Sequence, residues 1–426
     1  LAFSQTAIYN MDMAGFFTKW IPDLRDSQLE DGRFPNLAPH PADMEWLRWT
    51  NVEFVPAWSD AGVVIPWRVY LNYGDRRILE EQYEAARRWV EFVRSRNPDH
   101  LWRNDRGGDY GDWLHGDMTN LEDYPRGVSA MPLEAFATAF YADSARTLAR
   151  MAGVLDRKDE AVGYTRLFED IKVAFCRRYV DADGRIEGDT QGGYALALQL
   201  DLIDESLRPK ATEHLVEAIR QYKDHLSTGF LTTHLAMLVL SRYGRHSEAY
   251  RLINLRTVPS WGYMVERGAT TIWERWDGYV AERGFQSPNM NSFSHWAFGS
   301  VGEWVWRELA GINPDESCPG YQHFVIRPRP CGDLRWVKAR YDSIRGPIVC
   351  EWRIVDGRFE LEVEVPANTT ATVHVPATRP EAVTEGAGPA AKAEGVRFIG
   401  IDGSAAVFGV ESGRYRFQSE RHGECA

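Results

Sequence analysis

One carboxylate of this sequence lies in an unusually aromatic stretch, GATTIWERWDGY, at residues 268–279. Glu274 stands there between Trp273 and Trp276. Large aromatic side chains belong in protein interiors or in clefts, whereas carboxylates are normally solvated. Glu274 is therefore either a surface residue between two core anchors or an acid in an aromatic pocket, and for this motif alone we weigh the two interpretations equally.

Two further segments place carboxylates beside aromatic rings, WSD at residues 58–60 and DYGDW at residues 109–113. A sugar stacks its C–H faces on aromatic rings and bonds its hydroxyls to carboxylates, and hydrolysis of a glycosidic bond requires two carboxyl groups. The pattern therefore favours carbohydrate chemistry. Each motif alone is weak, because a Trp-Asp pair before a helix is more often a helix cap beside a core residue.

Other candidate groups favour structural roles when they are taken singly. His295, in NMNSFSHWAFG, is more often a hydrogen-bonded core histidine than a ligand group. Asp105, Asp109 and Asp117 indicate loop turns rather than a cation site. The sequence contains no GxSxG, GxGxxG, GxxxxGK[ST] or HExxH motif, so serine nucleophiles, nucleotide binding and zinc hydrolysis lack support. We therefore expect neither a metal nor a cofactor.

The spacing of apolar residues predicts helices over most of residues 1–310. Ala14, Phe17, Ile21 and Leu24 recur at intervals of three and four, which places them on one helix face. The same pattern predicts further helices at 60–74, 76–95, 131–153, 160–180, 190–200, 206–222, 228–244, 247–254 and 292–311. Helix pairs joined by long loops suit a closed ring. We expect a mainly α protein with an (α/α)6 barrel at residues 1–312, whose first part lies upstream of Leu1.

The pattern changes after a segment rich in glycine and proline, GINPDESCPG, at residues 311–320. RFELEVEVP (358–366) then alternates apolar and acidic residues, as a half-buried strand does. Similar segments predict strands at 322–330, 333–343, 347–357, 370–377, 405–410 and 413–418. We expect a small antiparallel β-sandwich at residues 313–426 that carries no catalytic residue.

The composition excludes several classes of partner. Lys and Arg number 49 and Asp and Glu 61, which gives a net charge of −12. An acidic chain without a basic tract is a poor candidate for nucleic acid, and no apolar run reaches the roughly 18 residues of a membrane span. Five cysteines without a CxxC pair argue against a disulfide scaffold or a zinc site. We expect a cytoplasmic protein with no nucleic-acid or membrane partner.

Several long segments resemble bacterial α-L-rhamnosidases of glycoside hydrolase family 78. They are TTIWERWDGYVAERGFQSPNMNSFSHWAFGSVGEWVWRELAGI, PGYQHFVIRPRP and WVKARYDSIRG, and upstream YNMDMAGFFTKWIPDLRDSQLEDGRFPN, WSDAGVVIPWRVYLNYGDRRILEEQY and GDWL. The resemblance covers nearly the whole chain, and residues 268–311 are its most specific part. It implies an (α/α)6 barrel followed by a β-sandwich. It also implies the release of terminal L-rhamnose from glycosides and polysaccharides, with inversion at the anomeric carbon.

The resemblance further implies roles for single residues. Glu274 matches the general base, which activates a water molecule. His295 matches a histidine that bonds to rhamnose, and two tryptophans match residues that line the sugar pocket. The substrate-binding residues expected on this basis, together with two neighbouring aspartates, are Trp58, Asp60, Asp112, Trp113 and His295.

The general acid of the family lies in a segment similar to DERxGWxGD, just before the stretch that opens this chain. No such segment occurs in this sequence, so we expect the acid upstream of Leu1. General acid catalysis is typically worth about 10²–10⁴-fold, so we expect this chain alone to be weakly active at best. Two alternatives stay open. One is another (α/α)6 glycosidase such as a glucuronyl hydrolase, and the other is a sugar-binding remnant without turnover.

Overall fold

The computed structural model describes residues 1–40 and 54–420. Contacts between residues divide the chain into two compact units. The first unit comprises Leu1–Ala7, Asp12–Trp67 and Arg76–Val301, and the second comprises Ile8–Met11, Arg68–Asp75 and Gly302–Ala426. The boundary expected after residue 312 thus falls inside the second unit. The reason is local, because the indole N–H of Trp352 donates to the carbonyl of Leu309 and ties residues 302–312 to the strands.

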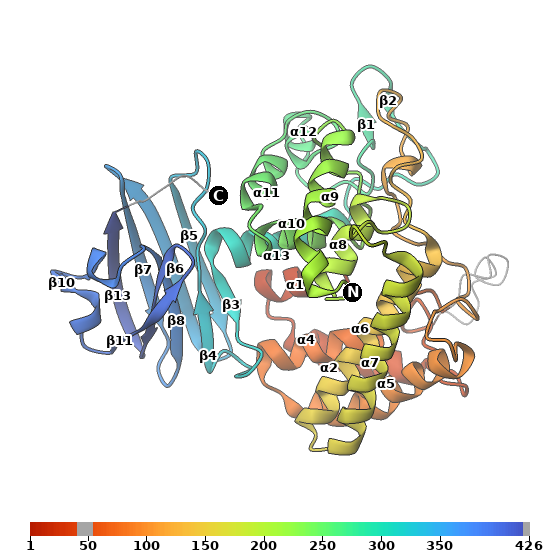
Figure 1. The fold of residues 1–426 in the computed structure, drawn as a ribbon, viewed down its shortest axis with the longest axis horizontal. Helices are drawn as coiled ribbons and strands as arrows, with labels where there is room; N and C mark the ends of the chain where they lie inside the picture. The colour runs from red at the N-terminus through yellow and green to blue at the C-terminus, as the bar shows by residue number, and fades with distance from the viewer. Residues whose placement is uncertain (41–53, 421–426) are drawn as a thin grey trace. The chain divides into compact units, whose positions relative to one another are not determined.

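Helices make up most of the chain before residue 311 (Figure 1). They are α1 (Ser4–Asn10), α2 (Ala14–Asp26), α4 (Ala61–Tyr73), α5 (Arg76–Arg96), α6 (Leu133–Val154), α7 (Lys158–Tyr179), α8 (Gln191–Gln199), α9 (Arg208–Gln221), α10 (Thr233–Arg242), α11 (His246–Ile253) and α12 (Trp261–Glu266). Three short turns of helix follow, η3 (Ala297–Val301), α13 (Gly302–Trp304) and the π-helix η4 (Val305–Ala310). The helical segment predicted at 292–311 therefore begins at residue 297, five residues after the predicted start.

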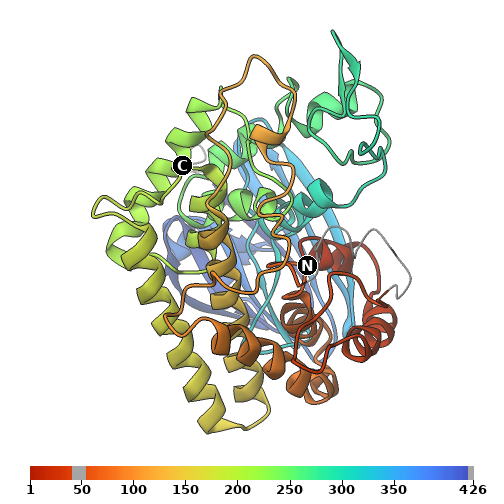
Figure 2. The ribbon, with the colours of Figure 1, turned by 90° about the vertical axis from the view of Figure 1, so that its right-hand side faces the viewer.

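The helices of the first unit form two layers because their apolar surfaces differ in width. Helices α8 and α10 are buried on nearly every face, and α6 on most of them. Helices α5, α7, α9 and α11 each bury one face and present charged residues on the other. Helix α6 packs against α7 (Figure 2), α8 against α9, and α10 against α11. Helix α8 also contacts both α6 and α10 and so lies between them. This alternation of inner and outer helices is the one expected of an (α/α)6 barrel.

The loops that precede the inner helices meet at one end of this arrangement. Each inner helix is followed by an outer helix that runs back, so the inner helices point the same way. Residues 54–60 precede α4, 97–132 precede α6, 222–232 precede α10 and 267–296 precede η3. The last of these loops contains the small hairpin of β1 (Tyr279–Val280) and β2 (Gly284–Phe285). All candidate site residues lie on these four loops.

The second unit is built around a β-sandwich. One sheet has the strand order β10-β9-β13-β7-β6-β5 and the other the order β11-β12-β8-β4-β3. Their bounds are β3 (Ile312–Pro314), β4 (His323–Ile326), β5 (Trp336–Ser343), β6 (Gly346–Val355), β7 (Arg358–Val365), β8 (Thr370–Pro376), β9 (Val383–Glu385), β10 (Gly388–Pro389), β11 (Val396–Asp402), β12 (Ala405–Val410) and β13 (Gly413–Glu420). Alternate residues of both sheets fill the core between them, among them Trp352, Phe359 and Phe417.

The sandwich differs from the sequence prediction in one pairing direction and in four unpredicted strands, the short β3, β9 and β10 and the longer β11. Strand β4 pairs parallel with β8, because the chain passes through β5, β6 and β7 of the other sheet before it returns. Strand β11 was not expected, and none of its residues is fully buried. It lies at the edge of its sheet and carries a register irregularity near Gly400, so its alternation of apolar and polar residues is weak.

Cys176, Cys318 and Cys350 are free thiols, whereas Cys331 is disulfide-bonded. Cys425 lies outside the described residues. The sequence pattern does not predict a bridge at Cys331, and the cytoplasmic location stays a prediction. Within residues 1–40 and 54–420, no helix combines the length and the apolar character needed to cross a membrane.

Candidate active site

The carboxylate of Glu274 is held by a neighbouring stretch of the same loop. The backbone N–H of Glu274 donates to the carbonyl of Ser292 over 2.9 Å, and the N–H of Ser292 donates to Oε2 of Glu274 over 2.8 Å. The N–H of His295 donates to the carbonyl of Ile272. These bonds occupy residues 292–295, which explains why the helix begins only at Ala297. Oε1 of Glu274 receives no hydrogen bond from the part of the chain that the structure describes.

The two tryptophans beside Glu274 are core anchors. Trp276 is buried, donates its indole N–H to the carbonyl of Thr228 over 3.0 Å, and stacks on Phe298 at 4.0 Å between ring centroids. Trp273 is also buried and packs edge-on against Phe293. Glu274 itself is only half-buried. The backbone therefore holds this carboxylate at the surface of an aromatic cluster.

A buried ion pair follows directly and joins this loop to another one. Nε of Arg275 lies 3.0 Å from Oδ1 of Asp277, and the two side chains are 6% and 0% exposed. Arg275 also donates to the carbonyl of Met118 over 2.9 Å, and Asp277 accepts the N–H of Asn120 over 2.7 Å. Both charges are thus hydrogen-bonded as well as paired, which a buried pair requires. The pair fixes the loop of Glu274 to residues 118–120.

His295 lies beside Glu274 in an aromatic setting. Its ring stacks on Trp296 at 5.2 Å and packs against Phe230 at 4.9 Å. Burial lowers the pKa of His295, and the negative charge of Glu274 opposes that shift. The ring is therefore neutral near pH 7. Because Nδ1 accepts the N–H of Ala297 over 3.2 Å, the proton of the neutral ring resides on Nε2, which can donate a hydrogen bond.

Trp58 and Trp113 come together through a third ring, that of Tyr110. The centroid of Tyr110 lies 4.9 Å from that of Trp58 and 5.4 Å from that of Trp113. All three side chains are half-buried. The N–H of Phe230 donates to the carbonyl of Trp113 over 2.9 Å, and Phe230 in turn packs against His295. A continuous series of contacts therefore connects the aromatic wall to the histidine beside Glu274.

Asp60 is placed differently from the sequence expectation, because it is fully buried. Its Oδ1 accepts the indole N–H of Trp89 over 2.9 Å and the hydroxyl of Ser144 over 2.6 Å, and its Oδ2 accepts the N–H of Ala57 over 2.8 Å. Burial raises the pKa of Asp60 to about 6, although these hydrogen bonds oppose the shift. The carboxylate joins the loop before α4 to two helices and presents no surface to a sugar.

Asp112 is also buried and holds the loop before α10. Its two oxygens accept the N–H groups of Gly229, Leu231 and Thr232, over 2.7, 2.9 and 3.1 Å, and the hydroxyl of Thr232. Burial raises the pKa of Asp112, and the hydrogen bonds oppose the shift. Four donors leave this carboxylate no room for a sugar hydroxyl. Phe230 lies within the segment that Asp112 holds.

Sequence motifs did not single out Tyr110, Phe230 or Trp296 as site residues. Tyr110 lies inside the DYGDW motif, so its position beside Trp113 was a usable signal. Phe230 carries no such signal in the sequence, because a phenylalanine directly before a buried helix is expected to belong to the hydrophobic core. Of the loop aspartates, Asp117 accepts the N–H groups of three residues in 127–130 and so holds a turn. No cluster of three or more potential metal ligands occurs in the described ranges.

The raised pKa of Asp60 predicts a pH effect on stability. The carboxyl has a pKa of about 6 when folded and 3.8 when unfolded, so the folded state binds more protons between these values. The contribution of this carboxyl to the free energy of unfolding is fully present below pH 4 and is lost as the pH rises through 6. For a pKa shift of roughly two units, the loss is about 3 kcal/mol. Asp60→Asn lacks this titration. Urea unfolding of both forms from pH 4 to 7 should show the wild type losing stability relative to the variant, and a constant difference would contradict the assignment.

Two layers of paired helices, with an acid, a histidine and aromatic rings on the loops before the inner layer, define the six-hairpin class of glycosidase domains. Residues 1–309 match the bacterial alpha-L-rhamnosidase 6 hairpin glycosidase domain, and residues 311–389 match the bacterial alpha-L-rhamnosidase C-terminal domain. The chain therefore belongs to the bacterial α-L-rhamnosidase family. The resemblance noted in the sequence and the expected fold class are both confirmed.

Individual relatives agree with this assignment. The alpha-L-rhamnosidase of Streptomyces avermitilis is 42% identical over 415 residues, which cover 97% of this chain and 37% of the relative. An alpha-L-rhamnosidase of Formosa agariphila is 33% identical over 383 residues, covering 89% of this chain and 40% of the relative. This chain therefore spans about two fifths of the length of these curated relatives.

Solved structures show the same fold. The crystal structure of Streptomyces avermitilis alpha-L-rhamnosidase complexed with L-rhamnose superposes with a TM-score of 0.88 at 40% identity, over 98% of this chain and 38% of that chain. The alpha-L-rhamnosidase from Dictyoglumus thermophilum gives a TM-score of 0.85 at 31% identity, over 99% of this chain and 45% of that chain.

Proposed function

We propose that this chain carries the general-base half of an inverting site that hydrolyses terminal α-L-rhamnosides. The observation that supports this most is the environment of Glu274. One carboxylate oxygen is fixed by a backbone N–H and the other faces no donor of the described chain, beside a neutral histidine. A general base needs a fixed orientation and one oxygen free for water.

Each neighbouring residue then has a distinct role in the proposal. Trp58 and Trp113 provide faces for the sugar ring, with Tyr110 between them. Nε2 of His295 donates a hydrogen bond to a sugar hydroxyl. Glu274 removes a proton from the water that attacks the anomeric carbon, opposite to the leaving group. The substrates are rhamnose-containing glycosides or polysaccharides.

Asp60 and Asp112 act in this proposal as positioning residues. Their oxygens are occupied by donors of the protein, so a sugar would have to break several buried hydrogen bonds to reach either one. Asp60 fixes the loop that carries Trp58. Asp112 fixes the loop that carries Phe230, which packs against His295.

The general acid comes in our proposal from a segment outside this chain. An inverting site needs a second carboxyl roughly 6.5–9.5 Å from the base. Asp109 lies next to the aromatic wall, and burial raises its pKa. Its Oδ1, however, accepts the N–H of Gly111 and its Oδ2 faces Arg106 at 3.6 Å, so we do not assign it as the acid. The greater length of the relatives leaves room for the acid elsewhere.

Hydrolysis of p-nitrophenyl α-L-rhamnoside tests the proposal, with this chain and with the longest natural form that contains it. Proton NMR should show the β-anomer of L-rhamnose first, because inversion of an α-glycoside gives the β-sugar. Release of the α-anomer first would exclude inversion. Turnover of an unsaturated glucuronide instead would favour a glucuronyl hydrolase. Binding of rhamnose without turnover by either form would favour the sugar-binding alternative.

His295→Ala should weaken rhamnose binding as well as turnover, because it removes a hydrogen bond made in the ground state. We expect KM to rise about tenfold, which corresponds to the loss of one hydrogen bond of about 1.4 kcal/mol. His295→Gln places an amide N–H near the position of Nε2 and should recover part of the affinity. Steady-state kinetics of both variants decide this, and an unchanged KM in His295→Ala would remove His295 from the binding residues.

A further inference from the structure

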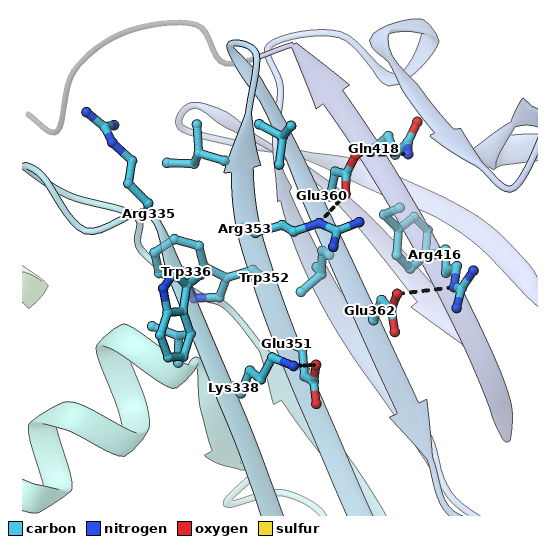
Figure 3. Close-up of a pocket in the computed structure, with 15 residues that line it drawn as sticks. Arg335, Trp336, Lys338, Glu351, Trp352, Arg353, Glu360, Glu362, Arg416 and Gln418 are labelled. Atoms are coloured by element: carbon cyan, nitrogen blue, oxygen red, sulfur yellow. Dashed lines mark hydrogen bonds and ion pairs between the residues drawn. The ribbon is translucent and has the colours of Figure 1, made fainter.

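A groove of about 360 Å³ lies on the outer face of the six-stranded sheet of the second unit (Figure 3). It runs over β5, β6, β7 and β13 and shares no lining residue with the candidate active site. The outer face of a sheet is expected to be polar, and most of this one is. Trp336, the first residue of β5, is nevertheless 62% exposed. Among the described residues, only Trp336 and Trp296 are exposed tryptophans, and Trp336 is the more exposed of the two.

Strand register places a row of polar groups beside this tryptophan. Across the four strands, the residues opposite one another are Trp336, Arg353, Glu360 and Gln418. Nε of Arg353 lies 2.5 Å from Oε2 of Glu360, and the amide of Gln418 reaches Oε1 of Glu360 at 3.5 Å. A pyranose can stack one face on an aromatic ring and bond its hydroxyls to neighbouring donors and acceptors. The indole of Trp336 and the polar side chains on the adjacent strands provide this combination.

The charges of the groove leave one cation in excess. Its three glutamates are each paired, Glu360 with Arg353, Glu351 with Lys338 at 3.6 Å and Glu362 with Arg416 at 3.2 Å. The fourth cation, Arg335, is exposed, and no carboxylate of the described residues lies within ion-pair distance of it. Figure 3 shows Arg335 above Trp336, with its guanidinium directed away from the sheet.

We propose that this groove binds an acidic sugar, with one face of a uronate ring on Trp336 and its carboxylate paired with Arg335. The arginine supplies the charge that distinguishes a uronate from a neutral hexose. The paired residues Arg353 and Glu360 then face the ring hydroxyls. The proposal does not depend on the chemistry of the active site, since none of its residues belongs to that site.

The test is calorimetric titration with hexagalacturonate and with its fully methyl-esterified form, which has the same rings without charge. Trp336→Ala should weaken hexagalacturonate binding at least about tenfold, and Trp336→Phe less. Arg335→Ala should weaken it about fivefold at low salt and bring it to the level of the ester. Two controls on the same hairpin should change nothing, Ile344→Ala, which is exposed and outside the groove, and Arg340→Ala, which is paired with Asp342.

Three results would overturn the proposal. The first is an absence of hexagalacturonate binding to the wild-type protein, with L-rhamnose present to occupy the active site. The second is equal binding of the acid and its ester, which would show that Arg335 selects no charge. The third is self-association of the wild type that Trp336→Ala abolishes in sedimentation experiments, which would make this face an interface between proteins.

Discussion

Glu274→Gln is expected to lower kcat on p-nitrophenyl α-L-rhamnoside by about 10²-fold or more, because a glutamine cannot accept a proton from the attacking water. The assay uses the longest natural form of the protein that is active. The fold of the loop should survive, since the amide oxygen can still accept the N–H of Ser292. Rhamnose affinity measured by calorimetry should change little, because the stacking on Trp58 and Trp113 does not depend on the charge at 274.

A matched control lies on the same loop. Glu282 is exposed between β1 and β2 and has no ion pair with the described residues, so Glu282→Gln should keep nearly full activity. If Glu274→Gln retained more than about a tenth of the wild-type kcat, Glu274 would not be the base, given the factor expected of that role.

Asp277→Ala should destabilise the helical unit by about 3–5 kcal/mol, because it leaves Arg275 buried without a counter-charge. The guanidinium would keep its bond to the carbonyl of Met118 and lose both contacts with the carboxylate. The N–H of Asn120 would also lose its acceptor. Urea denaturation followed by fluorescence measures the loss, and its free energy should fall by this amount at pH 7.

The double variant Arg275→Met/Asp277→Leu identifies the cause. Removing both charges leaves no unpaired ion, so much of the lost stability should return. The double variant also removes the bond from Arg275 to the carbonyl of Met118, so the loop of Glu274 loses this link and kcat should be low although the stability returns. Equal instability of the single and double variants would show that the loss comes from packing and not from the unpaired charge.

Much of the fold was predictable because a helix or strand that buries one face has apolar residues at regular intervals in the sequence. The helix stripes and the alternation in residues 358–365 identified both kinds of structure. The start of the last helix was not predictable, since it is decided by hydrogen bonds between residues 292–295 and a segment about twenty residues earlier. Strand β11 was missed because an edge strand with no buried residue lacks the alternation.

The site was predictable in part. The aromatic surroundings of Glu274 were visible in the sequence, and the structure brings His295, Trp58 and Trp113 into one series of contacts with its loop. The environment of Asp112 was not visible, because its donors lie more than a hundred residues away along the chain. Asp112 and a catalytic carboxylate share the same local signature, an acid next to a tryptophan. Only burial distinguishes the two.

The central claim is that the carboxylate of Glu274 occupies the position from which water is activated. Chemical rescue of Glu274→Gly by azide on p-nitrophenyl α-L-rhamnoside tests it most directly, because p-nitrophenolate leaves without help from an acid and the missing side chain makes room for the anion. The account predicts that azide restores p-nitrophenolate release and that NMR identifies β-L-rhamnosyl azide as the product. Absence of rescue in a correctly folded variant, or formation of the α-azide, would contradict it.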